Sequence, residues 1–444
     1  MKKTKRVLAI LIGLLLISLS TSALAEEVTL NLDGGDITIE MKAGGAYSVT
    51  IKNQGTTSYN NSDTSFTVTQ SDSNTATGNT ITIKAAAGQT AKVTLSGVNI
   101  DVSTLPKAAV STDGGGDVII ELKGKNTVKS GKGHAGVEKG NASKLTIADD
   151  GNDGSLEATG GNDAAGIGGG LMGSGSGITI SGGEVKATGG NNGAGIGGGL
   201  NGSGSNIIIT GGEVTATGGY QGAGIGGGYY GHGNNIAISG GEVKATGGQL
   251  GAGIGGGAEG FGSDITISGG TVKATSDHAG AGIGGGHKGS GNNIAFSGKV
   301  KATVQGGVGD RNYGAGAGIG DGGSFSNGNP VDGDDLHRTN SDLLNVSGLE
   351  PGAIIRCYKQ GTVIPDSLLY EIPELPTPEP SETPEPPTPD PSENPNPSTP
   401  PTPGGGNGGG HWHPTTTPVP VIVIPPKTGD MTIWQSILHF LGII

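Results

Sequence analysis

The segment GAGIGGG occurs four times, at positions 193–199, 222–228, 251–257 and 280–286, and the interval from each copy to the next is constant. A fixed period of about 20–50 residues is typical of a solenoid, in which each unit packs mainly on its two neighbours. The repeat therefore constrains the fold more than the composition does, although 93 of the 444 residues are glycine.

Within each unit, apolar residues alternate with polar residues. Ile178 and Ile180 alternate in GITIS, and Val185 and Ala187 alternate in GEVKAT. This is the period of a β-strand, and no window shows the spacing of an amphipathic helix. We therefore expect an all-β fold, a single-stranded parallel β-helix or solenoid with one 29-residue unit per coil and coils stacked about 4.8 Å apart.

Two ladders of equivalent residues follow from this stacking. Asparagines at a corner before one strand are expected to hydrogen-bond to the next coil, and isoleucines are expected to fill the core. Burying one isoleucine stabilises by about 1.5–3 kcal/mol, which offsets about 0.5–1 kcal/mol for each glycine. The isoleucine ladder is Ile167, Ile196, Ile225, Ile254 and Ile283, and the asparagine ladder is Asn206, Asn235 and Asn293.

The glycines of the repeat are expected to have two roles. Gly198 and Gly199 are predicted to turn the chain through positive φ, which glycine adopts without steric cost. Gly195 and Gly197 alternate with the core residues, so we expect them to leave a flat outward strip that carries no side chains.

The chain divides by composition into six segments. Irregular alternating strands precede the repeat, and a proline- and glycine-rich stretch that cannot bury a core follows it. The expected segments are a signal peptide (1–25), an N-terminal cap with irregular coils (26–158), the Gly-rich solenoid (159–330), a small C-terminal β cap (331–372), a disordered linker (373–424) and a sorting signal with a hydrophobic tail (425–444).

The N-terminus has the three parts of a secretory signal. Basic residues precede an apolar stretch from Val7 to Leu19, and Ala23-Leu24-Ala25 supplies a small-x-small cleavage site. Cleavage is predicted between Ala25 and Glu26, and the chain is therefore expected to be exported.

Near the C-terminus, Pro426-Lys427-Thr428-Gly429 and the apolar tail after it resemble the sortase sorting signal of Gram-positive bacteria, with Pro425 where that family usually has leucine. The resemblance implies that a sortase cuts between Thr428 and Gly429 and joins the chain to peptidoglycan. The expected location is the cell wall, on the extracellular surface.

Two variable turns flank the glycine strip in each unit, and aromatic residues gather in them. A flat strip edged by rings can bind sugars by stacking, whereas the alternative is that solenoid turns tolerate almost any residue. The formal net charge of −13 disfavours nucleic acid as a partner. The candidate ligand-binding residues are Tyr220, Tyr229, Tyr230, His232, Phe261 and His287.

No catalytic residue is assigned, and we expect the protein not to be an enzyme. Gly231-His232-Gly233 and Gly333-Asp334-Asp335 resemble fragments of polygalacturonase motifs, but nothing places a second pair of carboxylates, as glycoside hydrolysis requires.

No cofactor is required by the sequence, although calcium is possible. Asp149, Asp150 and Asp153 in DDGNDG are calcium candidates, and a plain turn is the alternative, because the EF-hand spacing and its final glutamate are absent.

The unit GAGIGGG/ITISGGEVKATGG resembles Gly-rich β-helix surface proteins of Gram-positive bacteria and, more loosely, the bacterial carbohydrate-binding β-helix domain family. This implies a wall-anchored binding protein or adhesin that recognises a polysaccharide or host glycan through its solenoid. A structural stalk or surface-layer component without a small ligand, and a polysaccharide lyase or hydrolase, are the alternatives.

Overall fold

The computed structural model describes residues 27–62, 64–141, 143–327, 329–336 and 344–358, together with the backbone of 365–371. The expected signal cleavage at Ala25 and Glu26, the linker and the sorting residues Pro426, Lys427, Thr428 and Gly429 lie outside the described residues.

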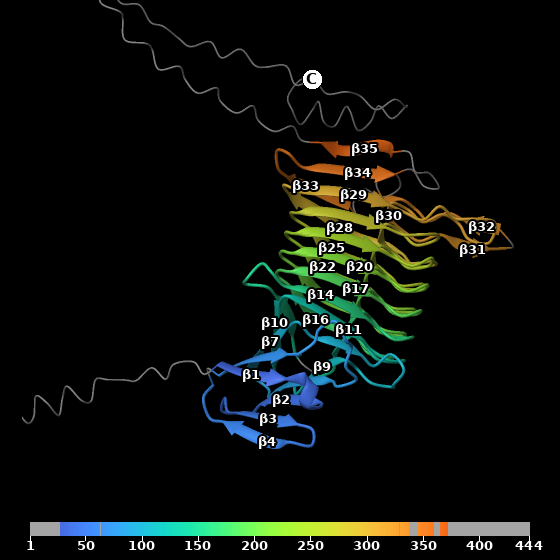
Figure 1. Ribbon diagram of the computed structural model, residues 1–444. Coiled ribbons are helices and arrows are strands. Elements are labelled where there is room, and N and C mark those ends of the chain that lie inside the picture. Colours follow the sequence, from blue (N-terminus) through green and yellow to red (C-terminus); the bar gives the residue numbers. More distant parts are fainter. Residues whose placement is uncertain are drawn as a thin grey trace, which may run out of the picture. The chain divides into compact units, whose positions relative to one another are not determined.

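Each coil of the repeat runs through three strands, one in each of three sheets (Figure 1). In one coil, β13 (Leu145–Ala148) leads round a corner into β14 (Ser155–Thr159), and a wide turn then leads to the two-residue strand β15 (Ile167–Gly168). A second wide turn reaches β16 (Gly175–Ile180), which pairs with β13 in parallel and begins the next coil. The predicted parallel β-solenoid is thus confirmed.

The three sheets are named in the order in which a coil visits them, and their strands are given for the described residues. Sheet 1 has 11 strands in the order β1 (Glu27–Asn31), β5 (Ser65–Thr69), β7 (Thr90–Ser96), β10 (Asp117–Lys123), β13, β16, β19 (Gly204–Ile209), β22 (Gly233–Ile238), β25 (Gly262–Ile267), β28 (Gly291–Gly298) and β33 (Leu344–Leu349).

Sheet 2 has 10 described strands: β8 (Asn99–Asp101), β11 (Lys125–Lys129), β14, β17 (Glu184–Thr188), β20 (Glu213–Thr217), β23 (Glu242–Thr246), β26 (Thr271–Thr275), β29 (Lys301–Gln305), β34 (Ile354–Tyr358) and β35 (Pro365–Glu371).

Sheet 3 has 12 described strands: β4 (Gly55–Tyr59), β3 (Tyr47–Ile51), β2 (Ile37–Met41), β6 (Ile81–Ala85), β9 (Val110–Asp113), β12 (Val137–Lys139), β15, β18 (Ile196–Gly197), β21 (Ile225–Gly226), β24 (Ile254–Gly255), β27 (Ile283–Gly284) and β30 (Ile319–Gly320).

The register of sheet 3 confirms the isoleucine ladder. Ile167 pairs with Ile196, and the pairing continues at the same interval through Ile225 and Ile254 to Ile283. All five side chains have an exposed fraction of 0% and belong to one continuous hydrophobic core. Their burial is the main favourable contribution that each glycine-rich coil makes to folding.

The ends of the solenoid carry antiparallel strands, as expected for caps. At the N-terminal end, β3 and β4 extend sheet 3 in antiparallel fashion from β2. At the other end, β33 and β34 continue sheets 1 and 2 in parallel, and β35 adds one antiparallel strand. Sheets 1, 2 and 3 pass residue 158 without interruption, so residues before and after it belong to the same stack.

Helix is almost absent from the described residues. Apart from Leu336, the helical residues described are those of a 3₁₀ turn, η1 (Leu32–Gly34). No helix in this described part is long and apolar enough to cross a membrane.

The predicted reason for the glycines after the isoleucine is wrong. Gly197 has a φ of 135°, whereas Gly198 and Gly199 do not have positive φ. A Cβ at Gly198 would lie 1.9 Å from the carbonyl oxygen of Gly202, and one at Gly199 would lie 2.1 Å from that of Gly170 on the preceding coil. Backbone packed this closely leaves room only for glycine.

Candidate functional site

The glycine strip is not an open surface. All seven residues of GAGIGGG at 193–199 are buried, so the expected exposed strip is wrong. The two wide turns that flank each strip meet across neighbouring coils. The Leu200 amide donates to the Asp163 carbonyl at 2.9 Å, and the Tyr229 amide donates to the Asn192 carbonyl at 2.9 Å. A ligand therefore meets the turns rather than the strip.

These turns form a stack of their own, here called the turn stack, which comprises residues 160–166 and 169–174 and their equivalents in later coils. One hydrogen bond per coil joins the tips: the amide of Asn201 donates to the Tyr229 carbonyl at 2.8 Å, and that of Tyr230 donates to the Ala258 carbonyl at 2.9 Å. Figure 1 shows these turns projecting to one side, with the hairpin of β31 (Ser324–Ser326) and β32 (Asn329–Val331) at the end of the row.

The turn stack has a small hydrophobic cluster that is separate from the main core. Leu250, Ala258 and Ala279 are buried in it, and Tyr229 and Tyr313 pack against them. Tyr313 comes from an insertion, because the step from Ile283 to its partner Ile319 is seven positions longer than the regular step of the ladder. Sequence analysis missed Tyr313, and this break in the period was the signal for it.

His287 belongs to this interior. Its side chain is 5% exposed, its Nδ1 lies 2.7 Å from the Gly323 carbonyl oxygen, and its ring meets the edge of Tyr313 at 5.0 Å. Because the carbonyl only accepts, Nδ1 carries the proton of the neutral ring. Burial lowers the pKa of His287 below its usual 6.5. The structure thus places this candidate inside the turn stack, away from a ligand.

The other five candidates lie on the outside of the turn stack, on neighbouring coils, and are here called the aromatic rim. Tyr220 is 41% exposed, Tyr230 47% and Phe261 47%, and Tyr229 and His232 are half-buried. Contiguous exposed apolar patches commonly mark interaction sites, so the rim is the candidate binding surface of the turn stack.

Two stacked pairs order the rim. The rings of Tyr229 and Tyr230 lie 3.8 Å apart, and the Tyr229 hydroxyl donates to that of Tyr230 at 2.7 Å. This bond, assisted by burial, raises the pKa of Tyr229 to about 12. His232 in the same turn stacks with Phe261 of the next coil at 4.9 Å with only 3° between the ring planes, and the Phe261 amide donates to His232 Nδ1 at 3.1 Å. The rim is therefore held in place before any ligand arrives.

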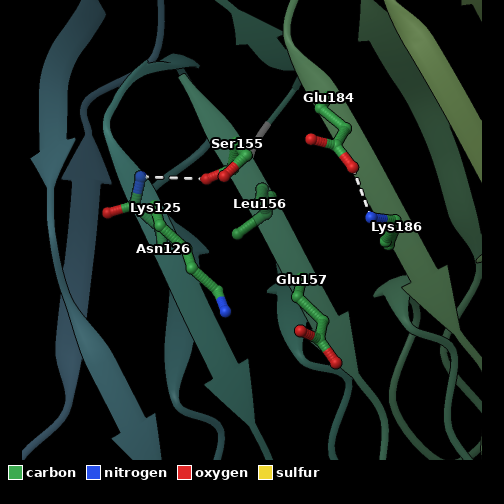
Figure 2. Close-up of a pocket in the computed structure, with 7 residues that line it drawn as sticks. All are labelled: Lys125, Asn126, Ser155, Leu156, Glu157, Glu184 and Lys186. Carbon is green, nitrogen blue, oxygen red and sulfur yellow. Dashed lines mark hydrogen bonds and ion pairs between the residues drawn. The ribbon is translucent and has the colours of Figure 1, made fainter. Parts of the chain in front are cut away.

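A shallow pocket of about 250 Å³ lies elsewhere, on β11, β14 and β17 of sheet 2 (Figure 2). Asn126 at its floor is fully buried at a position that the neighbouring coil fills with Leu156. Its amide nitrogen donates to three carbonyls, including that of Ser155 at 3.1 Å, and its oxygen accepts from the Val98 amide. The side-chain amide of Asn126 is thus satisfied by the fold, which favours a structural role for this residue.

Figure 2 also shows that Glu184 and Lys186 pair along their own strand at the rim of this pocket. Across strands, Glu184 lies in register with Glu213, so like charges stack from coil to coil. The attraction between Glu184 and Lys186 thus acts along one strand, whereas the cross-strand contact between the glutamates is repulsive.

The three calcium candidates lie in different environments. Asp149 is buried, whereas Asp150 pairs with Lys92 at 3.3 Å and Asp153 is exposed. Among the residues that the structure describes, no three His, Cys, Asp or Glu side chains are grouped closely enough to hold a metal ion.

Comparison with known proteins supports the repeat architecture. A family model described as "Beta helix repeat" matches residues 152–171, 178–200, 207–229, 236–258 and 265–287. The chain carries beta helix repeats. The matched segments extend from β14 to β27. They include Tyr220 and Tyr229 of the aromatic rim, whereas Tyr230, His232 and Phe261 lie between matched segments. Searches of curated proteins and of solved structures found no match.

Proposed function

We propose that the protein is a wall-anchored binding protein of a Gram-positive cell surface, whose beta helix repeats present a carbohydrate-binding rim. The exposed, pre-stacked rings of Tyr230 and Phe261 on the turn stack carry this proposal. Rings that stand ready in one geometry lose little conformational entropy when a sugar ring stacks on them. The proposal is of binding, without catalysis.

The location rests on the two ends of the sequence. The secretory signal before Glu26 and the segment Pro426-Lys427-Thr428-Gly429 support export and sortase attachment to peptidoglycan. Replacing Thr428 with alanine in the native host should release the chain from the wall fraction into the medium, whereas an unchanged wall fraction would contradict the anchoring.

A glycan array probed with the secreted chain tests the recognition. We expect binding to one class of neutral glycan. Its affinity should fall by about 5- to 150-fold when Tyr230 and Phe261 are both changed to alanine, since each stacked ring contributes about 0.5–1.5 kcal/mol. Ile208→Ala is the matched control, because Ile208 is 41% exposed on sheet 1, outside the rim.

A structural stalk is the second candidate, and one observation favours it. The rings of the rim already contact one another, as the Tyr229–Tyr230 and His232–Phe261 pairs show, so packing alone gives them a role. If the secreted chain binds no polysaccharide, mucin or cell surface, the stalk replaces the binding protein as the better account.

A further inference from the structure

The turn at residues 149–154 interrupts an otherwise constant corner between sheets 1 and 2. The step from Leu145 to its partner Ile178 is four positions longer than the step from Leu156 to its partner Val185. Four residues are therefore inserted here, between Asp149 and Gly154. In the next coil the same corner is simply Gly182-Gly183. The insertion is rich in carboxylates, which are ligands for cations such as calcium.

Asp149 at the start of this turn has one carboxylate oxygen without a partner. Its side chain is 8% exposed, and Oδ2 accepts from the Gly154 amide at 3.0 Å. Oδ1 is fully buried and has no hydrogen-bond partner among the described residues. The nearby Lys92 pairs instead with Glu121 at 3.2 Å and with Asp150 at 3.3 Å. A buried carboxylate oxygen left unpaired is costly, so a cation is the natural complement.

A second carboxylate lies close to the free oxygen of Asp149, on the other side of Gly151. A Cβ built on Gly151 would lie 3.7 Å from Asp149 Oδ1 and 3.0 Å from Asp153 Oδ1. Both oxygens therefore approach the same point beside Gly151, where no side chain stands. Gly151 does not have positive φ, so the backbone does not require glycine there. The close approach of Asp153 Oδ1 is itself a reason for the glycine.

We propose that the turn at 149–154 binds one calcium ion between Asp149 and Asp153, beside Gly151. Calcium takes six to eight oxygen ligands in flexible geometry and accepts backbone carbonyls and water as well as carboxylates. Two carboxylates with the carbonyls of the turn and solvent suit that preference, and a site with three acidic side chains is not needed. The ion would fix the inserted turn against the neighbouring coil, in which Gly182 and Gly183 lie close to Asp149.

Isothermal titration of the full chain with calcium chloride, after removal of calcium by a chelator, tests this site. We expect one ion per chain and a rise in Tm of about 2–4 °C at saturation. Asp149→Asn removes the buried charge, and Gly151→Ala fills the space while keeping both carboxylates. Both variants should lose calcium binding, whereas Asp150→Asn, in the same turn, should retain it.

Thermal melting without calcium shows whether a variant lost calcium binding because it misfolded. Without calcium, Asp149→Asn should melt at the same temperature as the wild type or higher, because it relieves an uncompensated buried charge. The proposal is overturned if the wild type binds no calcium, or if Asp149→Asn and Gly151→Ala both bind it as the wild type does.

Discussion

Asn235 and Asn206 occupy the same left-handed position on neighbouring coils, with φ of 52° and 54°, and Asn235 Nδ2 donates to Asn206 Oδ1 at 2.5 Å. Asn293 donates to Asp264 in the same way further along the stack. Two steps of the predicted ladder are therefore hydrogen-bonded. The structure adds a second reason for asparagine at this position, because it tolerates left-handed backbone better than most residues.

Asn235→Ala should destabilise the solenoid by about 1–2 kcal/mol, since alanine pays the steric cost of the left-handed conformation and loses the side-chain bond. Asn235→Gly should be much milder, because Gly177 holds the equivalent position in an earlier coil with a φ of 71°. Urea unfolding of both variants measures the difference, and equal losses would contradict the backbone argument.

Ile225→Ala should cost about 2–5 kcal/mol in the free energy of unfolding, because it leaves a cavity between Ile196 and Ile254 in the core. Ile208→Ala removes the same atoms from an exposed position on β19 and should change the free energy by no more than about 0.5 kcal/mol. Denaturant titration compares the two, and a similar effect at both positions would be inconsistent with a dry core.

Gly227→Ala should destabilise by about 1–3 kcal/mol or more, because its Cβ would lie 2.0 Å from the Gly231 carbonyl oxygen. Gly78→Ala is the control: its Cβ meets nothing within 4 Å and its φ is not positive. At Gly78, alanine reduces the conformational freedom of the unfolded chain. The free energy of unfolding should therefore stay unchanged or rise by about 0.4–1 kcal/mol. A Gly227→Ala variant as stable as Gly78→Ala would show that the coils are not packed this closely.

The buried His287 should make the turn stack sensitive to acid. Its pKa is lowered in the folded state, so below about pH 6.5 the unfolded chain binds a proton that the folded chain resists. Stability should therefore fall as the pH drops below 6.5. The difference in stability from His287→Gln should change with pH below 6.5 and become constant above it. Thermal melts of both proteins from pH 5 to 8 test this, and parallel curves would contradict the burial of the ring.

The hydroxyl bond between Tyr229 and Tyr230 should be visible in a titration. Tyr230→Phe removes the acceptor, so the pKa of Tyr229 should move from about 12 toward the usual 10. Ultraviolet difference titration of the tyrosines follows this change, with Tyr220→Phe as the control that leaves the pair intact. If Tyr230→Phe leaves the titration of Tyr229 where it was, the two rings are not paired in solution.

The solenoid could be predicted because its determinants repeat. Equivalent residues of a coil recur at a constant interval, so the partners of Ile196 and Ile225 in sheet 3 follow from spacing and strand alternation alone. The asparagine ladder could be inferred on the same grounds.

The turn stack could not be predicted in the same way, because its contacts join residues that vary between coils. The periodic pattern of the sequence does not indicate that the Leu200 amide bonds to the Asp163 carbonyl. Nor does it indicate that an insertion places the ring of Tyr313 against that of His287. The glycine strip was expected to be exposed because alternation shows which side faces away from the core, but not what covers that side.

The central claim is that successive repeat units lie directly on one another. Spin labels at Glu157 and Thr303, in a Cys357→Ala background, measure it most directly by pulsed dipolar spectroscopy. These positions are five coils apart, connected by the register through Lys186, Thr215, Lys244 and Lys273. The stack predicts a narrow distribution near about 24 Å, from five spacings of about 4.8 Å. A broad distribution around roughly 60–70 Å, as expected for a flexible glycine-rich chain of this length, would contradict it.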